Sequence, residues 1–168
     1  EELKSHGGSL RIYVSHKVLN KKINSNINKI LLKEKKLKLF NYKTYKNFSK
    51  KVKKIRENTL KFIYKNYKKN KKIAVYGAAA KGNTFLNFIN LDSKIINTAF
   101  DLSRYKAGKY LPGSKIKVQL PNKNLIKKYD IIIILPWNLQ NEITKQLKNK
   151  IKKNCKIYIC IPRIKKTN

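Results

Sequence analysis

The sequence lacks several features on which function commonly depends. It contains no methionine, not even at position 1, and it has only two cysteines and two histidines. A newly translated chain begins with methionine, so we expect that the N-terminus was trimmed or that the sequence is partial. The longest apolar run, Ile131 to Leu135, is far shorter than the roughly 20 residues of a membrane-spanning helix. We therefore expect no membrane partner, no signal peptide and a cytoplasmic location.

The scarce cysteines, histidines and acids form no recognisable catalytic or metal-binding set. Cys155 and Cys160 fall in one expected strand, where alternation places their side chains on opposite faces and argues against a disulfide. His6 and His16 have no nearby cysteine or acid at metal-ligand spacing, and no partners for a nucleophilic triad. We therefore assign no catalytic and no metal residue. His6, beside two glycines, suits either a ligand contact or a turn.

Positive charge dominates the composition. Lys and Arg total 42 against 8 Asp and Glu, which gives a formal net charge of +34 and suggests nucleic-acid binding. Only four of these residues are Arg, whereas the readout of phosphates and bases favours the bidentate guanidinium group. The lysines are spread over most of the chain, and AT-rich codons account for the abundance of Lys, Asn and Ile. We expect no nucleic-acid partner, but a general attraction for phosphorylated substrates.

The first 70 residues read as an N-terminal strand and a helical segment that packs on a sheet. Leu10, Ile12 and Val14 alternate with polar residues after a glycine pair, which predicts a strand. Apolar residues at helical spacing between about residues 25 and 70 predict a short helix followed by a longer one. Residues 71–168 are expected to form the α/β core, and the two parts together to form one domain.

Residues 71–168 alternate strand and helix patterns. The patterns predict strands at 73–76, 95–100, 129–135 and 156–161, helices at 80–90, 122–128 and 138–153, and a short extended piece at 115–118. The β-branched run within 129–135 is typical of a strand buried on both faces. Repeated strand–helix–strand order predicts a Rossmann-like, doubly wound and mostly parallel α/β sheet.

The clearest local pattern is a turn of small residues from Gly77 to Thr84. It follows a strand and opens a helix, where main-chain N–H groups and the helix dipole can approach an anion. Ala79 stands where the dinucleotide pattern has its second glycine, and Lys81 precedes Gly82, so the phosphate-loop pattern is not met. An anion site and tight strand–helix packing both remain open. The candidate binding residues here are Gly77, Ala78, Lys81, Gly82, Asn83 and Thr84.

Two further segments end strands at the same edge of the expected sheet. Asp101 follows the second strand, where an acid binds ribose hydroxyls in doubly wound domains or caps a turn. Pro136, Trp137 and Asn138 follow the buried strand; the tryptophan suits stacking on a base or sugar, or covering the core, and the asparagine suits helix capping. The loop 106–114 fits a lid, an anion clamp or a solvated loop.

Four segments recur in a fixed order that resembles a known family. They are His6-Gly7-Gly8-Ser9-Leu10-Arg11, Tyr76 to Thr84, Leu111-Pro112-Gly113-Ser114 and Ile134-Leu135-Pro136-Trp137-Asn138. Together they resemble the C-terminal domain of the bacterial sugar C-methyltransferases that depend on S-adenosyl-L-methionine (SAM), over about residues 6 to 162. The resemblance implies an N-terminal zinc-binding region, a central SAM-binding methyltransferase domain and a C-terminal domain that helps to enclose a nucleotide-linked keto sugar.

The resemblance also implies how the work is divided. A base removes a proton beside the sugar ketone, and the enolate attacks the SAM methyl group; the family's catalytic cluster and zinc cysteines precede the His-Gly-Gly segment and are absent here. We expect this chain alone to be inactive, and its partners to be the nucleotide-sugar substrate and the upstream methyltransferase domain. Lys81, Asn83 and Thr84 would donate to phosphate or sugar, and Asp101 would accept from ribose or order a loop.

The alternative is an autonomous nucleotide- or NAD-binding Rossmann module that uses the Gly77 turn and Asp101.

Overall fold

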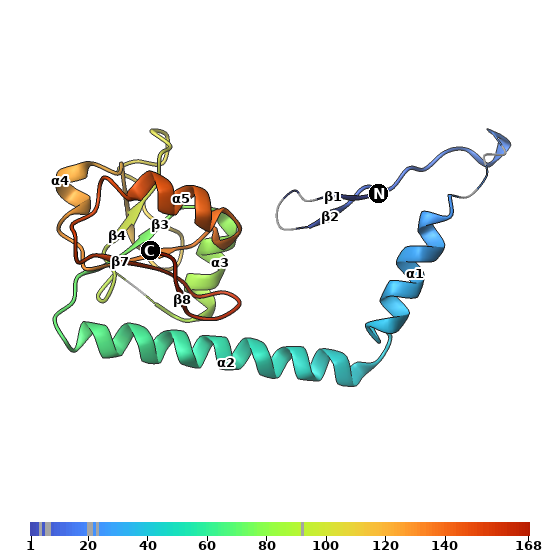
Figure 1. Cartoon of the computed structure of the whole chain (residues 1–168), viewed down its shortest axis with the longest axis horizontal. Coiled ribbons are helices and arrows are strands. Elements are labelled where there is room, and N and C mark those ends of the chain that lie inside the picture. The colour runs from blue at the N-terminus through green and yellow to red at the C-terminus, as the bar shows by residue number, and fades with distance from the viewer. Residues whose placement is uncertain (4, 6–7, 20–21, 23, 92) are drawn as a thin grey trace. The chain divides into compact units, whose positions relative to one another are not determined.

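The computed structural model describes residues 1–3, 5, 8–19, 22, 24–91 and 93–168 (Figure 1). The chain divides into two compact units, residues 1–51 and residues 52–168, which we call unit 1 and unit 2. Among the described residues, no helix combines the length and the apolar character that crossing a membrane would require.

Unit 1 consists of a two-stranded antiparallel hairpin followed by helices. Its elements are β1 (Glu2–Leu3), β2 (Ser9–Leu10), the 3-10 helix η2 (Lys17–Leu19), α1 (Asn26–Lys36) and the first part of α2 (Tyr42–Tyr67). The strand predicted to continue through Ile12 and Val14 is wrong beyond Leu10, because residues 11–14 belong to no strand and their side chains are exposed. Alternating apolar residues hold a strand in place only where one face is buried.

Both predicted helices of the N-terminal segment are confirmed, and local residues define their ends. The Asn24 side chain accepts a hydrogen bond from the amide of Asn26 (2.9 Å) at the start of α1. After α1, Lys38 adopts a left-handed conformation (φ 55°), which ends the helical path. The Asn41 side chain accepts from the amide of Lys43 (2.9 Å) as α2 begins. Since no glycine or proline interrupts it, α2 then continues for 26 residues.

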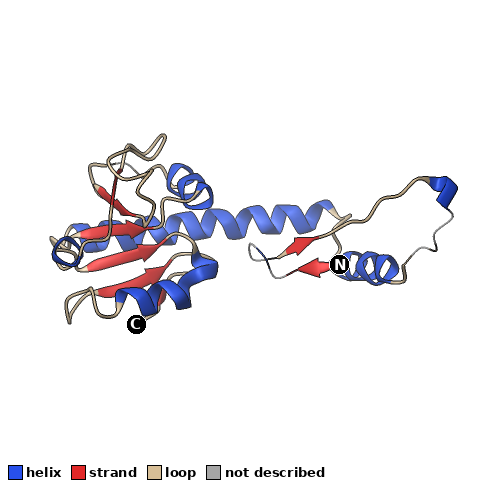
Figure 2. Ribbon diagram, turned by 90° about the horizontal axis from the view of Figure 1, so that it is seen from above, coloured by secondary structure: helices blue, strands red, loops and turns tan. Residues whose placement is uncertain are grey.

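Unit 2 is built on a six-stranded sheet. Its strands are β3 (Ile73–Tyr76), β4 (Thr98–Phe100), β5 (Lys117–Gln119), β6 (Ile131–Ile134), β7 (Lys156–Ile159) and β8 (Lys165–Lys166). Its other helices are α3 (Ala80–Phe88), α4 (Lys123–Ile126), the 3-10 helix η3 (Trp137–Leu139) and α5 (Gln140–Leu147). The strand order is β5-β4-β3-β6-β7-β8, and every neighbouring pair is parallel except β7 with β8. Figure 2 shows these strands side by side with helices against them. The Rossmann-like, mostly parallel prediction is confirmed.

The sheet buries an apolar cluster on each face. Ile73 and Val75 of β3 join one cluster, and Ala74 and Tyr76 join the other; β6 alternates in the same way. The first, which we call the α2–α3 cluster, includes Ile63 of α2, and the second, the α4–α5 cluster, includes Leu147 of α5. The prediction that the strand within 129–135 is buried on both faces is therefore confirmed.

Near the C-terminus, the structure differs from the sequence prediction in one helix and one strand. The helix predicted over 138–153 begins only at Gln140, after η3, and ends at Leu147, which is the last residue of α5 to reach the α4–α5 cluster. The antiparallel strand β8 was not predicted. Both of its residues, Lys165 and Lys166, are exposed, so the sequence carries no apolar alternation there.

Candidate functional site

The described candidate residues gather at one edge of the sheet in unit 2. They follow the carboxyl ends of β3, β4 and β6, and the strand order reverses between β3 and β6. In open α/β sheets, ligands bind outside the carboxyl ends of strands at such a reversal. His6, the remaining candidate, lies outside the residues that the structure describes.

Two glycines let the turn after β3 pack closely on the segment that follows β6. Gly77 has a left-handed φ of 96°, and a Cβ atom there would lie 2.4 Å from Cδ of Pro136. In α3, a Cβ atom on Gly82 would lie 2.5 Å from Cβ of Leu135. Both distances are below van der Waals contact, so the packing interpretation of these two glycines holds. Packing also joins the Gly77 turn to the Pro136 corner.

The main chain of the turn is bound to the end of β4. The amide of Gly77 donates to the carbonyl oxygen of Phe100 (2.6 Å), and the amide of Ala78 donates to Oδ2 of Asp101 (2.7 Å). The other carboxylate oxygen of Asp101 accepts from the amide of Ser103 (2.9 Å). Both oxygens of this largely buried carboxylate therefore order main chain, which is the geometry of a loop-ordering acceptor.

Lys106 also links the turn after β3 to the end of β4. Its Nζ donates to the carbonyl oxygen of Ala78 (2.9 Å) and lies 3.4 Å from Oδ2 of Asp101. The sequence placed Lys106 in a loop that fits a lid, an anion clamp or a solvated loop, and its position five residues after Asp101 was the available signal. Farther along the loop, the Asn87 side chain of α3 donates to the carbonyl oxygen of Pro112 (3.1 Å). The loop is thus fastened to the turn and to α3.

Three candidate side chains meet where α3 faces the corner after β6. Nζ of Lys81 donates to Oδ1 of Asn138 (2.7 Å) and lies 5.0 Å from the centroid of the Trp137 ring. At that distance the ammonium group is attracted to the face of the ring. The expectation that Asn138 caps the next helix is wrong. Leu139 occupies the cap position of α5 without a side-chain hydrogen bond, and the Asn138 amide oxygen is taken by Lys81.

The remaining two polar side chains of the turn, Thr84 and Asn83, differ in whether they have a hydrogen-bond partner. The Thr84 hydroxyl donates to the carbonyl oxygen of Ala80 (3.1 Å), one turn back in α3. Oδ1 of Asn83 is buried and has no hydrogen-bond partner within the part of the chain that the structure describes. A buried acceptor without a donor costs free energy, so Asn83 is suited to accept from a further group.

Burial raises the pKa of one phenol and two thiols near the core. Burial raises the pKa of Tyr76, and the nearby Asp101 carboxylate raises it further. Burial also raises the pKa of Cys155 to about 11 and that of Cys160 to about 12. Both cysteines are free, and they lie in different apolar clusters, so the prediction of opposite faces is confirmed.

The donor groups of the described residues do not fit the cofactors that the resemblance implies. No group of three or more His, Cys, Asp or Glu side chains among them could hold a metal ion. The Asp101 carboxylate, the candidate ribose acceptor, already accepts two main-chain hydrogen bonds. The Lys81, Trp137 and Asn138 group offers an ammonium, an aromatic face and an amide. None of these groups is suited to abstract a proton from carbon.

Comparisons with known proteins point in one direction. A family model described as "C-methyltransferase C-terminal domain" matches residues 4–162. The C-methyltransferase NovU of Streptomyces niveus is 25% identical over 157 residues, which cover 94% of this chain and 37% of NovU. The chain therefore spans little more than a third of the length of this relative.

Proposed function

The chain belongs to the C-methyltransferase C-terminal domain family, and from this premise we propose that it forms the substrate-binding part of a SAM-dependent sugar C-methyltransferase of the cytoplasm. Its ligand in this proposal is a nucleotide-linked keto sugar. SAM and zinc are held by other domains of the longer protein, since the described residues fit neither. The chain alone then binds the substrate without methylating it.

The observation that carries this proposal is the position of Lys81. Its ammonium group is held between the Trp137 ring and the Asn138 amide, at the edge where the strand order reverses. An ammonium held in place offers a charge-assisted hydrogen bond to a phosphate oxygen, and such bonds contribute about 1.5–3 kcal/mol. The ring offers a face on which a base or sugar stacks, and the amide offers a partner for a hydroxyl group.

The residues of this chain hold and orient the substrate in the proposed reaction. Bound SAM supplies the electrophilic methyl group. Lys81 would fix the diphosphate through its ammonium group, and the fixed diphosphate would place the keto sugar toward the methyltransferase domain. Holding the substrate in this orientation lowers the activation free energy of methyl transfer, because the translational and rotational freedom of the reactants is already lost on binding. No described candidate residue removes the proton beside the ketone.

The alternative, an autonomous NAD-binding module, has less support. Dinucleotide binding in this fold uses a free acid for the ribose and a second glycine for close approach of the pyrophosphate. Here the Asp101 carboxylate is bound by the amides of Ala78 and Ser103, and Ala79 stands in place of the glycine. A nucleotide sugar bound through Lys81 and Trp137 requires neither feature.

Calorimetric titration of the 168-residue chain tests the proposal. We expect dTDP-glucose or UDP-glucose to bind, and Lys81→Ala to weaken binding about 10- to 100-fold through loss of the charge-assisted bond. Lys145→Ala, which removes the same charge from the exposed face of α5, is the matched control and should bind as the unmodified chain does. Equal affinity of the two variants would remove Lys81 from the site. Tighter binding of NAD than of either nucleotide sugar would support the alternative.

A further inference from the structure

A cavity of unit 2 lies at the amino ends of two parallel strands. It has a volume of about 630 Å³, and its lining includes Ile131 and Lys156, the first residues of β6 and β7, which are register partners. The candidate site follows the carboxyl ends of the strands, and the four residues of β6 separate the two edges by roughly 13 Å. The cavity is therefore distinct from the site around Lys81.

Positive charge dominates the lining of this cavity. Four lysines line it, and no ammonium group among them makes a hydrogen bond or ion pair with another described residue: Lys71, Lys153, Lys156 and Lys166. Asp130 is the acidic residue of the lining, and its carboxylate already accepts from Nζ of Lys152 and from the amide of Lys72, both at 2.8 Å. Lys152 thus balances the carboxylate, which leaves four positive charges around the cavity without a counter-charge.

Hydrogen bonds and ring packing hold the walls of the cavity in place. The Asn168 side chain accepts from the amide of Ile157 (2.7 Å) and donates to the carbonyl oxygen of Cys155 (2.9 Å). The ring of Tyr158, which also lines the cavity, packs on Phe62 of α2 with centroids 4.8 Å apart. Because these contacts exist without a ligand, a ligand would bind without the cost of ordering the walls.

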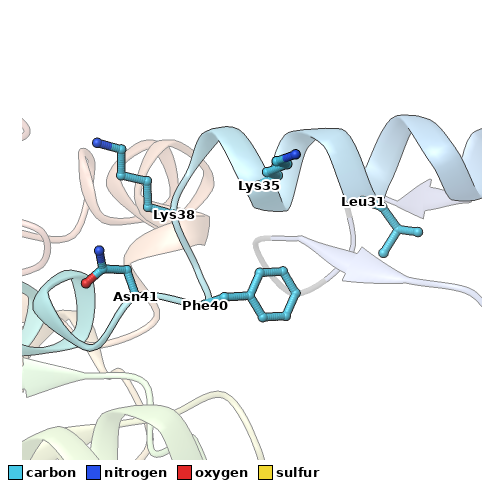
Figure 3. Close-up of a pocket in the computed structure, with 5 residues that line it drawn as sticks. All are labelled: Leu31, Lys35, Lys38, Phe40 and Asn41. Carbon is cyan, nitrogen blue, oxygen red and sulfur yellow. The ribbon is translucent and has the colours of Figure 1, made fainter.

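The groove of unit 1 offers no comparable site. Leu31, Lys35, Lys38, Phe40 and Asn41 line a space of about 530 Å³ (Figure 3). Two of these residues are lysines, and the Phe40 side chain is 83% exposed. The cavity of unit 2 therefore has twice as many lysines around a lining that is more firmly held.

We propose that the cavity at the amino ends of β6 and β7 binds a small anion that carries two phosphate groups. A phosphate group carries a charge of about −1.5 to −2 at pH 7, so two of them balance four ammonium groups, whereas one leaves half of that charge unpaired. Lysine binds phosphate oxygens as a point charge and a hydrogen-bond donor. Asn66, in the last turn of α2, also lines the cavity. The negative helix end there contributes only about half a unit of charge.

This site is independent of the proposed function, because it uses none of the residues at the carboxyl edge of the sheet. Calorimetric titration of the 168-residue chain with sodium pyrophosphate tests it. The chain carries Lys81→Ala, so that the carboxyl-edge site does not contribute. Salt at about 0.15 M screens the general attraction between a highly charged chain and an anion. We expect pyrophosphate to bind this chain, and orthophosphate to bind it at least tenfold more weakly.

Single substitutions locate the binding. Lys156→Gln and Lys166→Gln should each weaken pyrophosphate binding about tenfold, through loss of one charge-assisted hydrogen bond. Lys117→Gln is the matched control and should keep the affinity. Lys117, like Lys156, is the exposed first residue of a strand, but its strand β5 lies at the opposite end of the strand order from β8. Since all three side chains are exposed, thermal unfolding should be the same in each variant.

Three results would overturn the proposal. A loss with Lys117→Gln as large as that with Lys156→Gln would assign the binding to net charge. Absence of pyrophosphate binding to the Lys81→Ala chain would leave the amino-edge cavity without a ligand. Equal affinity for citrate, a trivalent anion without phosphate, would show that the cavity selects charge alone. The proposed function is decided separately, by the binding of a nucleotide sugar to the chain that retains Lys81.

Discussion

Units 1 and 2 are both rich in lysine but differ in what they bury. Unit 2 covers both faces of its sheet with apolar clusters, and large side chains such as Phe100 and Ile132 are fully buried. Unit 1 has equally clear helical patterns and no buried described residue. The contrast shows that amphipathic periodicity specifies a helix but not the surface that the helix covers.

The energetic consequence is that cooperative stability should reside in unit 2. Its core residues contribute through area removed from water and through close packing, whereas those of unit 1 contribute little until a partner covers them. Four pairs of substitutions, one in each unit, measure this difference. The expected effect decreases from the first pair to the last.

The largest contrast is expected between two phenylalanines. Phe100→Ala removes a fully buried ring that contacts Tyr129 edge-on, with ring centroids 5.5 Å apart, and should lower the free energy of unfolding by about 3–5 kcal/mol. Phe40→Ala should change it by less than about 0.5 kcal/mol. Urea denaturation followed by circular dichroism measures both values. Comparable losses would show that unit 1 has a core of its own.

The second contrast concerns glycines. An alanine in place of a helical glycine usually stabilises by about 1 kcal/mol. Gly82→Ala should instead destabilise by about 1–3 kcal/mol, because the new Cβ meets Leu135. The double variant with Leu135→Ala should lose less than the sum of the two single losses. Gly8→Ala strains the main chain at a φ of 127°, although nothing lies within 4 Å of the added atom, and should leave global unfolding unchanged because Gly8 lies in unit 1, outside the buried core. Stabilisation by Gly82→Ala would contradict the packing described above.

The third contrast depends on pH. Burial acts to raise the pKa of Asp130, but hydrogen bonds from the Lys152 side chain and the Lys72 amide, both 2.8 Å, outweigh it and leave that pKa lowered. A carboxyl group with a lowered folded pKa stabilises above its unfolded pKa of about 4 and loses this effect as pH falls through the folded value.

Asp130→Asn should therefore cost about 1–2 kcal/mol at pH 7, and the difference from the unmodified chain should shrink below about pH 4. Thermal unfolding across pH 3 to 7 measures the difference. Glu2→Gln, which breaks the exposed ion pair with Lys33, should not alter unfolding of unit 2 at any pH. An Asp130→Asn effect of constant size from pH 3 to 7 would exclude the ionised carboxylate as its cause.

The smallest contrast lies in two asparagines that accept from an amide two residues ahead. Asn122 accepts from Asn124 (2.8 Å) and caps α4, so Asn122→Ala should cost about 0.5–1 kcal/mol of global stability. Asn24 makes the same contact with Asn26 at the start of α1. Asn24→Ala should lower only the protection of α1 amides from hydrogen exchange, without a change in global unfolding. A global loss in both variants would join α1 to the cooperative unit.

The sequence predicted the fold class because burial patterns are local. The apolar run in β6, the helical spacing in α2 and the small residues after β3 each report the surroundings of their own segment. The same patterns were enough for the family resemblance and for the opposite faces of Cys155 and Cys160. They could not predict β8, whose two lysines pair with β7 through main-chain hydrogen bonds.

The arrangement of the candidate site was decided by tertiary structure alone. Lys81 and Asn138 are 57 residues apart, and Ala78 and Asp101 are 23 apart. From the sequence we predicted that Asn138 caps a helix and that Asp101 accepts from a ribose or orders a loop. In the folded chain, the Asn138 side chain accepts a hydrogen bond from Lys81, and the Asp101 carboxylate accepts one from the Ala78 amide. The physical reason is that periodicity along a chain records whether a residue is buried, whereas a hydrogen bond depends on which distant group the fold brings within about 3 Å.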